Sequence, residues 1–340
     1  MDLIYIKTTD AGTESGFLKN CEVSFDVTTD VDYATNLFEL SMSLPEDRSD
    51  LLWMEDGVQT IIFAEGTEFG GEVSGYTIDL DEGTVKYTGR TWRGTLSQWI
   101  IEPPAGEDYR VVSGNLKVIM DSLPMSDYIE VEQTEYSVGT FQFNRYVNVF
   151  EGMTSLMGAV AANLRAGIEF HEDGNGSGKA VLTFRPARDL TDLVEVSQDY
   201  DSRVQLKITV DGDTPRELIC LGQGELHERE VIRLYADDDW NISTTAIQGA
   251  YPVETYDYSS STDLLNDGMK HYRELIGNHR QIDLQVGDFD VRLSDIVAGK
   301  DVFTGEKVTA EVTSIIYRCI DYGGHKEETY EYKTKVRVKS

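Results

Sequence analysis

Apolar and polar residues alternate along much of the chain, which is the pattern of half-buried β-strands. In residues 203–210 every second side chain is apolar, and residues 38–44 repeat the same two-residue period. Residues 76–80 and 85–87 flank an Asp-Glu-Gly sequence, in which Gly83 supplies the positive φ that a tight turn requires. The sequence therefore predicts a β-rich protein with a hairpin at this turn.

A helical period appears in three segments. In residues 116–123 apolar side chains recur at steps of three and four before a proline ends the helix. A longer apolar stripe predicts a helix over about residues 149–165, with Gly167 as its C-terminal cap. The third stripe predicts a helix over about residues 262–276, for which Thr262 is a candidate N-cap and Gly277 the end. All three stripes are typical of helices that pack on a core.

The distribution of these patterns divides the chain of 340 residues into three parts. Residues 1–95 are β-rich, residues 96–198 mix two helices with strands, and residues 199–340 are again β-rich with one inserted helix. Pro103-Pro104 and the segment 199–202 are candidate seams. The expected fold class is β-rich α+β.

The charge of the chain is strongly one-sided. It contains 30 Lys and Arg against 61 Asp and Glu, a formal net charge of −31 spread along the whole length. Because like charges repel, this surface should avoid nucleic acid and anionic membranes. No segment approaches the roughly 18 consecutive apolar residues of a membrane span, and the N-terminus lacks the pattern of a signal peptide. We therefore expect a soluble protein.

Three cysteines, Cys21, Cys220 and Cys319, lie among apolar or β-branched neighbours without metal-binding spacing. An odd number in this setting favours buried free thiols in a reducing compartment over disulfides.

Residues for catalysis are few and scattered. The five histidines form no HExxH or His-Cys cluster, and there is no GxSxG sequence. The glycines in residues 221–225 lack the third glycine and the Lys-Ser or Lys-Thr of a phosphate loop, and an extended segment follows them. Residues 236–241 are acidic but lack the spacing of a calcium loop, so a solvated turn is favoured. We expect no catalytic residues, no cofactor and no metal, although 61 acidic residues could conceal a carboxylate pair.

One segment, YTGRTWRGTLSQWIIEPPA at residues 87–105, concentrates two tryptophans and two arginines. Trp92 and Trp99 are large apolar anchors, and Arg90 and Arg93 can form bidentate pairs with carboxylates. A structural junction explains this composition without a ligand. The alternative, an aromatic and cationic patch for nucleic acid, is disfavoured by the surrounding acids.

Three long motifs resemble the hub, or tail-tip, proteins of long-tailed siphophages. They are TEFGGEV at residues 67–73, GRTWRGTL at 89–96 and LICLGQGELHEREVIRLY at 218–235, followed in the same order by GKDVFTGEKV at 299–308. The resemblance covers nearly the whole chain. The motif residues that we single out are Gly89, Arg90, Trp92, Arg93, Gly94, Gly222, Gln223, Gly224, Glu225 and Arg229.

The resemblance implies a specific architecture and role. Members of this family resemble baseplate hubs: two β-barrel tube domains separated by a mixed α/β domain, assembled as a homotrimer. Such a hub closes the tail tube, adapts its six-fold symmetry to three-fold symmetry and forms the channel for DNA ejection. The implied partners are a distal-tail ring or tail-tube protein and tail-tip or receptor-binding proteins. The implied location is the virion tail tip, after synthesis in the bacterial host cytoplasm.

The negative charge suggests a role for such a channel. A lumen lined with carboxylates would repel phosphate, so that DNA slides past without binding. Asp79, Asp81 and Glu82, in the predicted hairpin, are our candidates for lumenal acids.

Two alternatives remain open from the sequence. One is a tail-associated peptidoglycan hydrolase, which requires two close carboxylates in a cleft. The other is a carbohydrate-binding receptor module, in which the tryptophans line an exposed platform. The tryptophans are Trp53, Trp92, Trp99 and Trp240.

Overall fold

The computed structural model describes most of the chain and divides it into two compact units. It describes residues 1–32, 34–53, 58–173, 177–191, 195–196, 205–210, 213–238, 240–261, 263–285, 291–300 and 307–336, with the backbone alone for residues 49, 195–196, 205–210, 277–285, 299–300, 307–308 and 336. Unit 1 comprises Met1–Arg188, Val286–Asp295 and Thr313–Tyr332; unit 2 comprises Asp189–Gln285, Ile296–Val312 and Lys333–Ser340.

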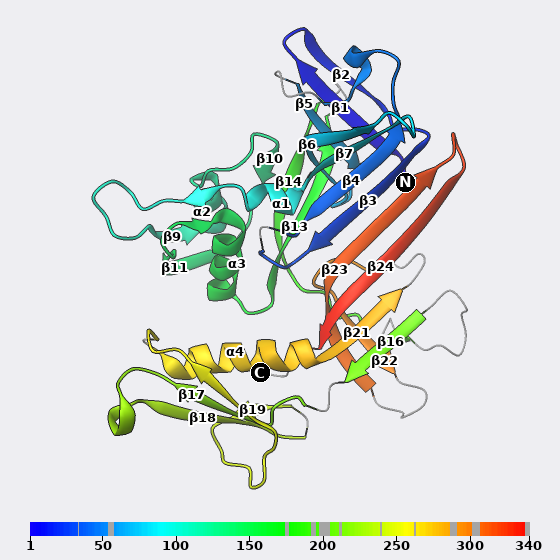
Figure 1. Cartoon of the computed structure of the whole chain (residues 1–340). Coiled ribbons are helices and arrows are strands. Elements are labelled where there is room, and N and C mark those ends of the chain that lie inside the picture. Colours follow the sequence, from blue (N-terminus) through cyan, green and yellow to red (C-terminus); the bar gives the residue numbers. More distant parts are fainter. Residues whose placement is uncertain are drawn as a thin grey trace. The chain divides into compact units, whose positions relative to one another are not determined.

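Unit 1 begins with an antiparallel sheet in the order β2-β1-β5-β6-β7-β4-β3-β23 (Figure 1). The alternation of apolar residues decides which face of each strand is buried; in β3, for example, every second residue is buried. The predicted strand at residues 38–44 and the predicted hairpin are both present, and Gly83 has a φ of 64°. The strands are β1 (Leu3–Thr9), β2 (Gly12–Phe17), β3 (Cys21–Thr28), β4 (Leu37–Ser43), β5 (Gln59–Ala64), β6 (Gly70–Asp79), β7 (Thr84–Thr91) and β23 (Lys307–Asp321), of which residues 307–312 belong to unit 2; a 3₁₀ turn covers Arg48–Asp50.

The remainder of unit 1 is a mixed α/β segment. Each of its three helices starts at a side chain that caps a backbone N–H: Thr91 for α1, Asn115 for α2 and Asn148 for α3. A three-stranded sheet, β10-β14-β13, continues the segment. The elements are α1 (Trp92–Leu96), β8 (Ile100–Ile101), β9 (Val111–Asn115), α2 (Leu116–Asp121), β10 (Ile129–Val131), β11 (Ser137–Gln142), β12 (Val147–Asn148), α3 (Val149–Val160), β13 (Leu164–Glu172) and β14 (Gly178–Pro186).

Sheet and mixed segment share one hydrophobic core. Ile61 and Phe63 of β5 belong to the same buried cluster as Leu116 of α2, Met153 of α3 and Phe170 of β13. The rings of Phe63 and Phe170 lie 4.1 Å apart, centre to centre. Burial of aromatic side chains contributes strongly to stability. Because these contacts join residues on both sides of position 95, the two predicted parts fold onto one core.

Two helix boundaries differ from the sequence prediction, and one helix was missed. α3 ends at Val160, and Gly167 is not its cap but lies inside β13, paired with Thr183. The apolar stripe in the sequence extends to Leu164 because this residue is also buried, but as the first residue of strand β13. α4 continues through Gly277 to His279, while Thr262 lies outside the described residues. α1 was missed because its five residues are too short to show a helical period.

Unit 2 contains a four-stranded sheet, β19-β18-β17-β20, with α4 along one face (Figure 1). Leu264, Tyr272 and Ile276 of the helix are buried against Leu218 and Leu234 of the sheet. The predicted strand at residues 203–210 appears as β16, paired with β21. The elements are β15 (Glu195–Val196), β16 (Gln205–Val210), β17 (Glu217–Leu221), a 3₁₀ turn (Leu226–Glu228), β18 (Val231–Ala236), β19 (Ile242–Ser243), β20 (Val253–Asp257), α4 (Leu264–His279), β21 (Arg280–Gln285), β22 (Ile296–Lys300) and β24 (Lys326–Val336), the last with residues in both units.

The expected β-rich class is confirmed. The division at residues 95 and 198 stays a prediction: its first two parts lie in unit 1 as far as Arg188, and the third contributes to both units. The candidate seam at 199–202 falls outside the described residues. Among the described helices, none has the length and apolar character needed to cross a membrane.

All three cysteines are buried free thiols, as predicted. Burial raises the pKa of Cys21 and of Cys220 to about 11, and it also raises the pKa of Cys319. Since the thiolate is the reactive form, we expect no rapid reaction with Ellman's reagent at pH 8 in the folded protein. In urea all three thiols should react. Rapid labelling of any one of them before unfolding would contradict the burial described here.

Candidate functional site: the motif junction and the tyrosine pocket

A buried ion pair between Arg93 and Glu68 joins two of the motifs, and we call this contact the motif junction. Arg93, at the start of α1, donates from Nε and Nη2 to the two carboxylate oxygens of Glu68, at 2.9 Å each. Its Nη2 also donates to the carbonyl oxygen of Ala166 at 2.6 Å, and Glu68 accepts from the backbone N–H of Ile168 at 3.1 Å. Only 4% of the Arg93 side chain and 20% of that of Glu68 are exposed. This pair therefore ties TEFGGEV and GRTWRGTL to strand β13.

Trp92 packs beside this ion pair in the interior of unit 1. It is 1% exposed, and its indole stacks on Phe170 with the ring centres 5.2 Å apart and the planes at 14°. A side chain at Gly70 would place its Cβ 2.7 Å from the indole nitrogen, so the tryptophan fits only against glycine. The predicted structural junction accounts for Trp92 and Arg93 without a ligand.

The remaining motif glycines allow neighbouring backbones to approach. A Cβ at Gly71 would lie 1.9 Å from the carbonyl oxygen of Arg90, and one at Gly94 would lie 2.3 Å from that of Asn36. Gly89 is equally restricted, with the carbonyl oxygen of Glu72 at 2.1 Å. These distances leave no room for a side chain. The glycines of both motifs thus serve strand and helix packing.

The third motif forms the loop that joins β17 to β18. Gln223 donates to the carbonyl oxygen of Ser261 at 2.8 Å, and Arg229 donates to that of Gly222 at 3.1 Å and forms an ion pair with Asp257. As predicted, an extended strand and no helix follows the loop.

The rest of this loop has special backbone positions. Gly224 has a φ of 96°, which glycine adopts readily. Glu225 precedes the 3₁₀ turn without a side-chain capping bond. Leu226 then has a φ of 52° and is 91% exposed, so an apolar side chain is presented at the tip in a strained conformation. Sequence reasoning missed this leucine because a single exposed apolar residue in a loop leaves no periodic signal.

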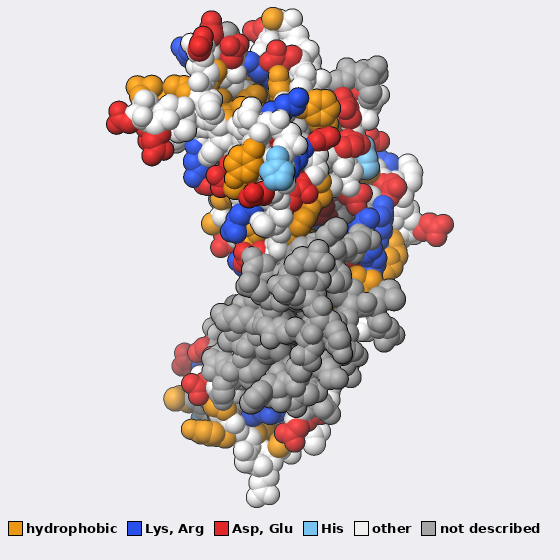
Figure 2. All heavy atoms as spheres, turned by 90° about the vertical axis from the view of Figure 1, so that its right-hand side faces the viewer, with side chains coloured by type: hydrophobic (Ala, Val, Ile, Leu, Met, Phe, Trp, Pro, Cys, Tyr) orange, Lys and Arg blue, Asp and Glu red, His pale blue; other side chains and the backbone are white. Residues whose placement is uncertain are grey.

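The acids proposed for the channel lie at the tip of the β6–β7 hairpin. Asp79, Asp81 and Glu82 are all exposed, and Asp79 accepts the backbone N–H groups of the other two at 2.9 and 3.0 Å. Leu80 beside them is 80% exposed. On the face drawn in Figure 2, acidic side chains are distributed among basic and apolar ones over the described atoms. Whether these three acids face a channel stays a prediction.

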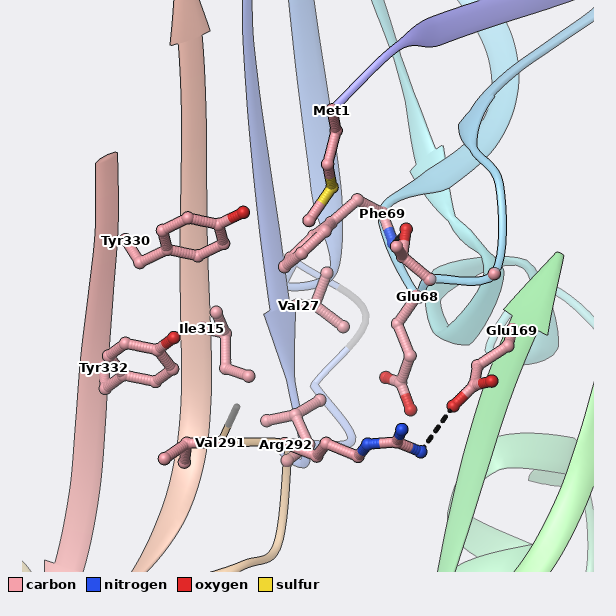
Figure 3. A pocket seen from close by; sticks show the side chains of 13 residues that line it. Met1, Val27, Glu68, Phe69, Glu169, Val291, Arg292, Ile315, Tyr330 and Tyr332 are labelled. Atoms are coloured by element: carbon pink, nitrogen blue, oxygen red, sulfur yellow. Dashed lines mark hydrogen bonds and ion pairs between the residues drawn. The ribbon is translucent and has the colours of Figure 1, made fainter. Parts of the chain in front are cut away.

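A pocket of about 330 Å³ lies directly beside the motif junction, in unit 1 (Figure 3). We call it the tyrosine pocket. Phe69, from the first motif, lies on its apolar side with Tyr330 and Tyr332 of β24. Glu68 and Glu169 lie on the other side, where Glu169 accepts from Arg292 at 2.9 Å. The tyrosines alternate in the sequence ETYEYK, a strand signal that did not predict a pocket.

The two carboxylates of the tyrosine pocket bear on the hydrolase alternative. A glycosidase pair needs one carboxyl group that donates a proton and another that acts as base or nucleophile. Here Glu68 is held by Arg93, and Glu169 is held by Arg292. Each of the two carboxylates is thus already occupied by an ion pair with an arginine. The pocket therefore does not favour hydrolysis.

The four tryptophans do not form the exposed platform that the carbohydrate alternative required. Trp92 is buried, whereas Trp99 is 40% exposed. Trp53 contacts the edge of Tyr76, and the ring of Trp240 lies under the guanidinium of Arg216 at 3.9 Å. Trp240 belongs to unit 2, and the others belong to unit 1.

Metal ligands do not gather in the part of the chain that the structure describes. No group of three or more His, Cys, Asp or Glu side chains there could hold a metal ion. In the acidic turn at 236–241, Asp237 instead accepts the backbone N–H of Asn241 at 2.8 Å. The late motif GKDVFTGEKV falls largely outside the described residues.

Comparison with known proteins relates the whole chain to phage tails. No protein-family model matches it, and neither does any curated protein. Among solved structures, the 43 kDa tail protein of prophage MuSo2 from Shewanella oneidensis has a TM-score of 0.63 at 13% identity, covering 98% of both chains. The prophage tail protein gp18 of Listeria monocytogenes gives 0.58 at 11%, covering 100% of this chain and 96% of its own. The tail protein of Neisseria meningitidis gives 0.56 at 13%, covering 98% and 97%. The resemblance inferred from the motifs is thus confirmed at the level of the fold: this chain has the fold of prophage tail proteins.

Proposed function

We propose that this protein is a structural subunit of a tailed-phage or prophage tail tip. In this proposal it forms a trimeric hub that closes the tail tube, adapts six-fold to three-fold symmetry and forms the channel for DNA ejection. The observation that carries the proposal is the full-length similarity to three tail proteins, two of them from prophages, with at least 96% of each chain covered. A shared fold alone does not fix function. The motif residues support a structural role, because their glycines let backbones approach closely and Arg93 and Glu68 form a buried ion pair.

The two predicted barrel tube domains belong to this proposal. So do the location at the virion tail tip and the partners: further copies of the chain, a distal-tail ring or tail-tube protein, and tail-tip or receptor-binding proteins. A chain with a net charge of −31 would carry three times that charge as a trimer. A channel lined by part of this charge would repel the phosphates of DNA. Asp79, Asp81 and Glu82 remain our candidates for its lining.

The proposal predicts a salt-dependent trimer. Light scattering over a range of protein and salt concentrations should give three times the monomer mass, with the trimer strengthened by salt because screening weakens repulsion between acidic subunits. Electron microscopy of the same sample should show a three-fold ring with an acidic channel. A dimer, or a ring with a neutral or basic channel, would contradict the proposal. An electron-microscopy map that resolves side chains would show whether Asp79, Asp81 and Glu82 reach the lumen.

A further inference from the structure

A second pocket in unit 1, of about 580 Å³, has a lining quite different from that of the tyrosine pocket. We call it the Trp99 pocket. It is lined by Gln59 of β5, Glu72 of β6, Gln98 and Trp99 between α1 and β8, Tyr128 just before β10, and Lys179 of β14. Its volume lies within the range of small-molecule sites in proteins. The backbone of Glu72 takes part in the contact between the first two motifs, whereas its side chain lines this pocket.

The backbone at Trp99 is held in place, and its indole is left partly uncovered. The backbone carbonyl oxygen of Trp99 accepts from the N–H of Val149 at 2.9 Å, and β8, directly after it, pairs with β12. The side chain nevertheless remains 40% exposed, and no ring of the described residues stacks on it. Exposed single apolar residues are common, but this one lines a concave site. A partly uncovered aromatic face in a pocket can receive the apolar face of a ligand.

Around the indole the lining is polar and largely uncharged. Gln59 and Gln98 contribute exposed amides, and Tyr128 contributes a half-buried phenol. Lys179 already donates to the carbonyl oxygen of Asp127 at 2.6 Å. These groups offer several donors and acceptors in one cavity.

Glu72 supplies the strongest acceptor. Its side chain is partly buried, and its carboxylate has no hydrogen bond or ion pair with any described residue. Burial raises the pKa of Glu72, as expected for a carboxyl group without a partner. A ligand hydroxyl that donates to this carboxylate would replace water at a partly desolvated acceptor.

This combination selects one class of ligand. An anion would be repelled by Glu72 and Asp127, and a purely apolar ligand would leave the amides and the carboxylate unsatisfied. A neutral sugar has hydroxyl groups at its rim and an apolar C–H face, which match the carboxylate and amides on one hand and the indole on the other. We propose that the Trp99 pocket binds neutral saccharides of one or two pyranose rings. The proposal concerns ligand binding and does not depend on the hub function proposed above.

The test uses the full chain and defined probes. Calorimetry and saturation-transfer NMR would measure binding of maltose and of N,N′-diacetylchitobiose, with glucuronic acid as an anionic comparison and N-acetylargininamide as a cationic one. We expect at least one neutral disaccharide to bind with a millimolar Kd and the anion to bind more weakly. Trp99→Ala should weaken binding at least about tenfold through loss of the stacked face, and Trp99→Phe should retain part of it. Glu72→Gln should weaken binding about threefold or more.

The matched control is Tyr109→Ala, which removes an aromatic residue of similar exposure, 43%, outside the pocket lining. It should leave binding unchanged, and circular dichroism should show all variants folded. The proposal is overturned if no neutral disaccharide binds, if Trp99→Ala binds like the unaltered chain, or if the cation alone binds through Glu72. Light scattering separates this result from the hub proposal: saccharide binding with unchanged oligomeric state supports the pocket alone. If the unaltered chain binds no sugar and Trp99→Ala changes the oligomeric state, the proposal is wrong and Trp99 lies in a subunit interface.

Discussion

Replacement of Arg93 by alanine is expected to lower the free energy of unfolding of unit 1 by about 3 kcal/mol or more. The substitution removes two hydrogen bonds to Glu68 and one to the Ala166 carbonyl oxygen from a site where only 4% of the arginine was exposed. It also leaves the Glu68 carboxylate partly buried without its cation. Since 20% of the Glu68 side chain still reaches solvent, we expect the low end of the range for broken buried pairs, about 3 to 5 kcal/mol.

Urea unfolding followed by tryptophan fluorescence measures this effect, because Trp92 lies next to the pair in the sequence and in the core. The double substitution Glu68→Gln with Arg93→Met should be less destabilising than Arg93→Ala alone, since no charge is left without a partner. The control is Lys86→Ala, which breaks an exposed ion pair with Glu39 and should cost less than about 1 kcal/mol. Equal effects of Arg93→Ala and Lys86→Ala would show that the junction does not stabilise unit 1.

The sequence predicted the local elements well because their signals are local. The β6–β7 hairpin follows from a two-residue apolar period on both sides of Gly83, and α2 follows from a clean helical stripe. The length of α3 was overestimated for the same reason: a stripe reports burial and does not distinguish the end of a helix from the start of a buried strand at Leu164. Short α1 left no periodic signal.

For contacts between distant segments, the sequence predicts the type of partner but not which residue it is. The residue types predicted that Arg93 would find a carboxylate, but the choice of Glu68, 25 residues earlier, depends on which strands pair. Likewise the stacking of Trp92 on Phe170 and the meeting of Phe69 with Tyr330 and Tyr332 arise from topology. The Trp99 pocket belongs to this class too, because its lining residues come from five separate segments. For the same reason the sequence could not identify Glu72 as the unpaired carboxylate.

Replacement of Gly71 by alanine is expected to destabilise unit 1 by about 3 kcal/mol or more, and it can prevent folding. Gly71 lies in β6 opposite Thr91 of β7. The added Cβ would lie 1.9 Å from the carbonyl oxygen of Arg90, 2.7 Å from its carbonyl carbon and 2.8 Å from the Cα of Thr91. All three atoms belong to backbone, so no rotamer change relieves the overlap and the two strands must separate. Their separation would also shift Trp92, which follows Thr91 and fits against Gly70.

Gly139→Ala is the matched control, because Gly139 also lies in a strand, β11, but a Cβ there meets nothing within 4 Å. It should change the free energy of unfolding by less than about 1 kcal/mol, with either sign, since alanine restricts the unfolded chain. Urea midpoints of the two variants measure the difference, and soluble yield reports a variant that cannot fold. Gly89→Ala, with a carbonyl oxygen at 2.1 Å, should behave like Gly71→Ala. If both tight positions tolerate alanine as Gly139 does, β6 and β7 do not approach as closely as described, and the motif glycines then require a reason other than packing, such as contact with a partner.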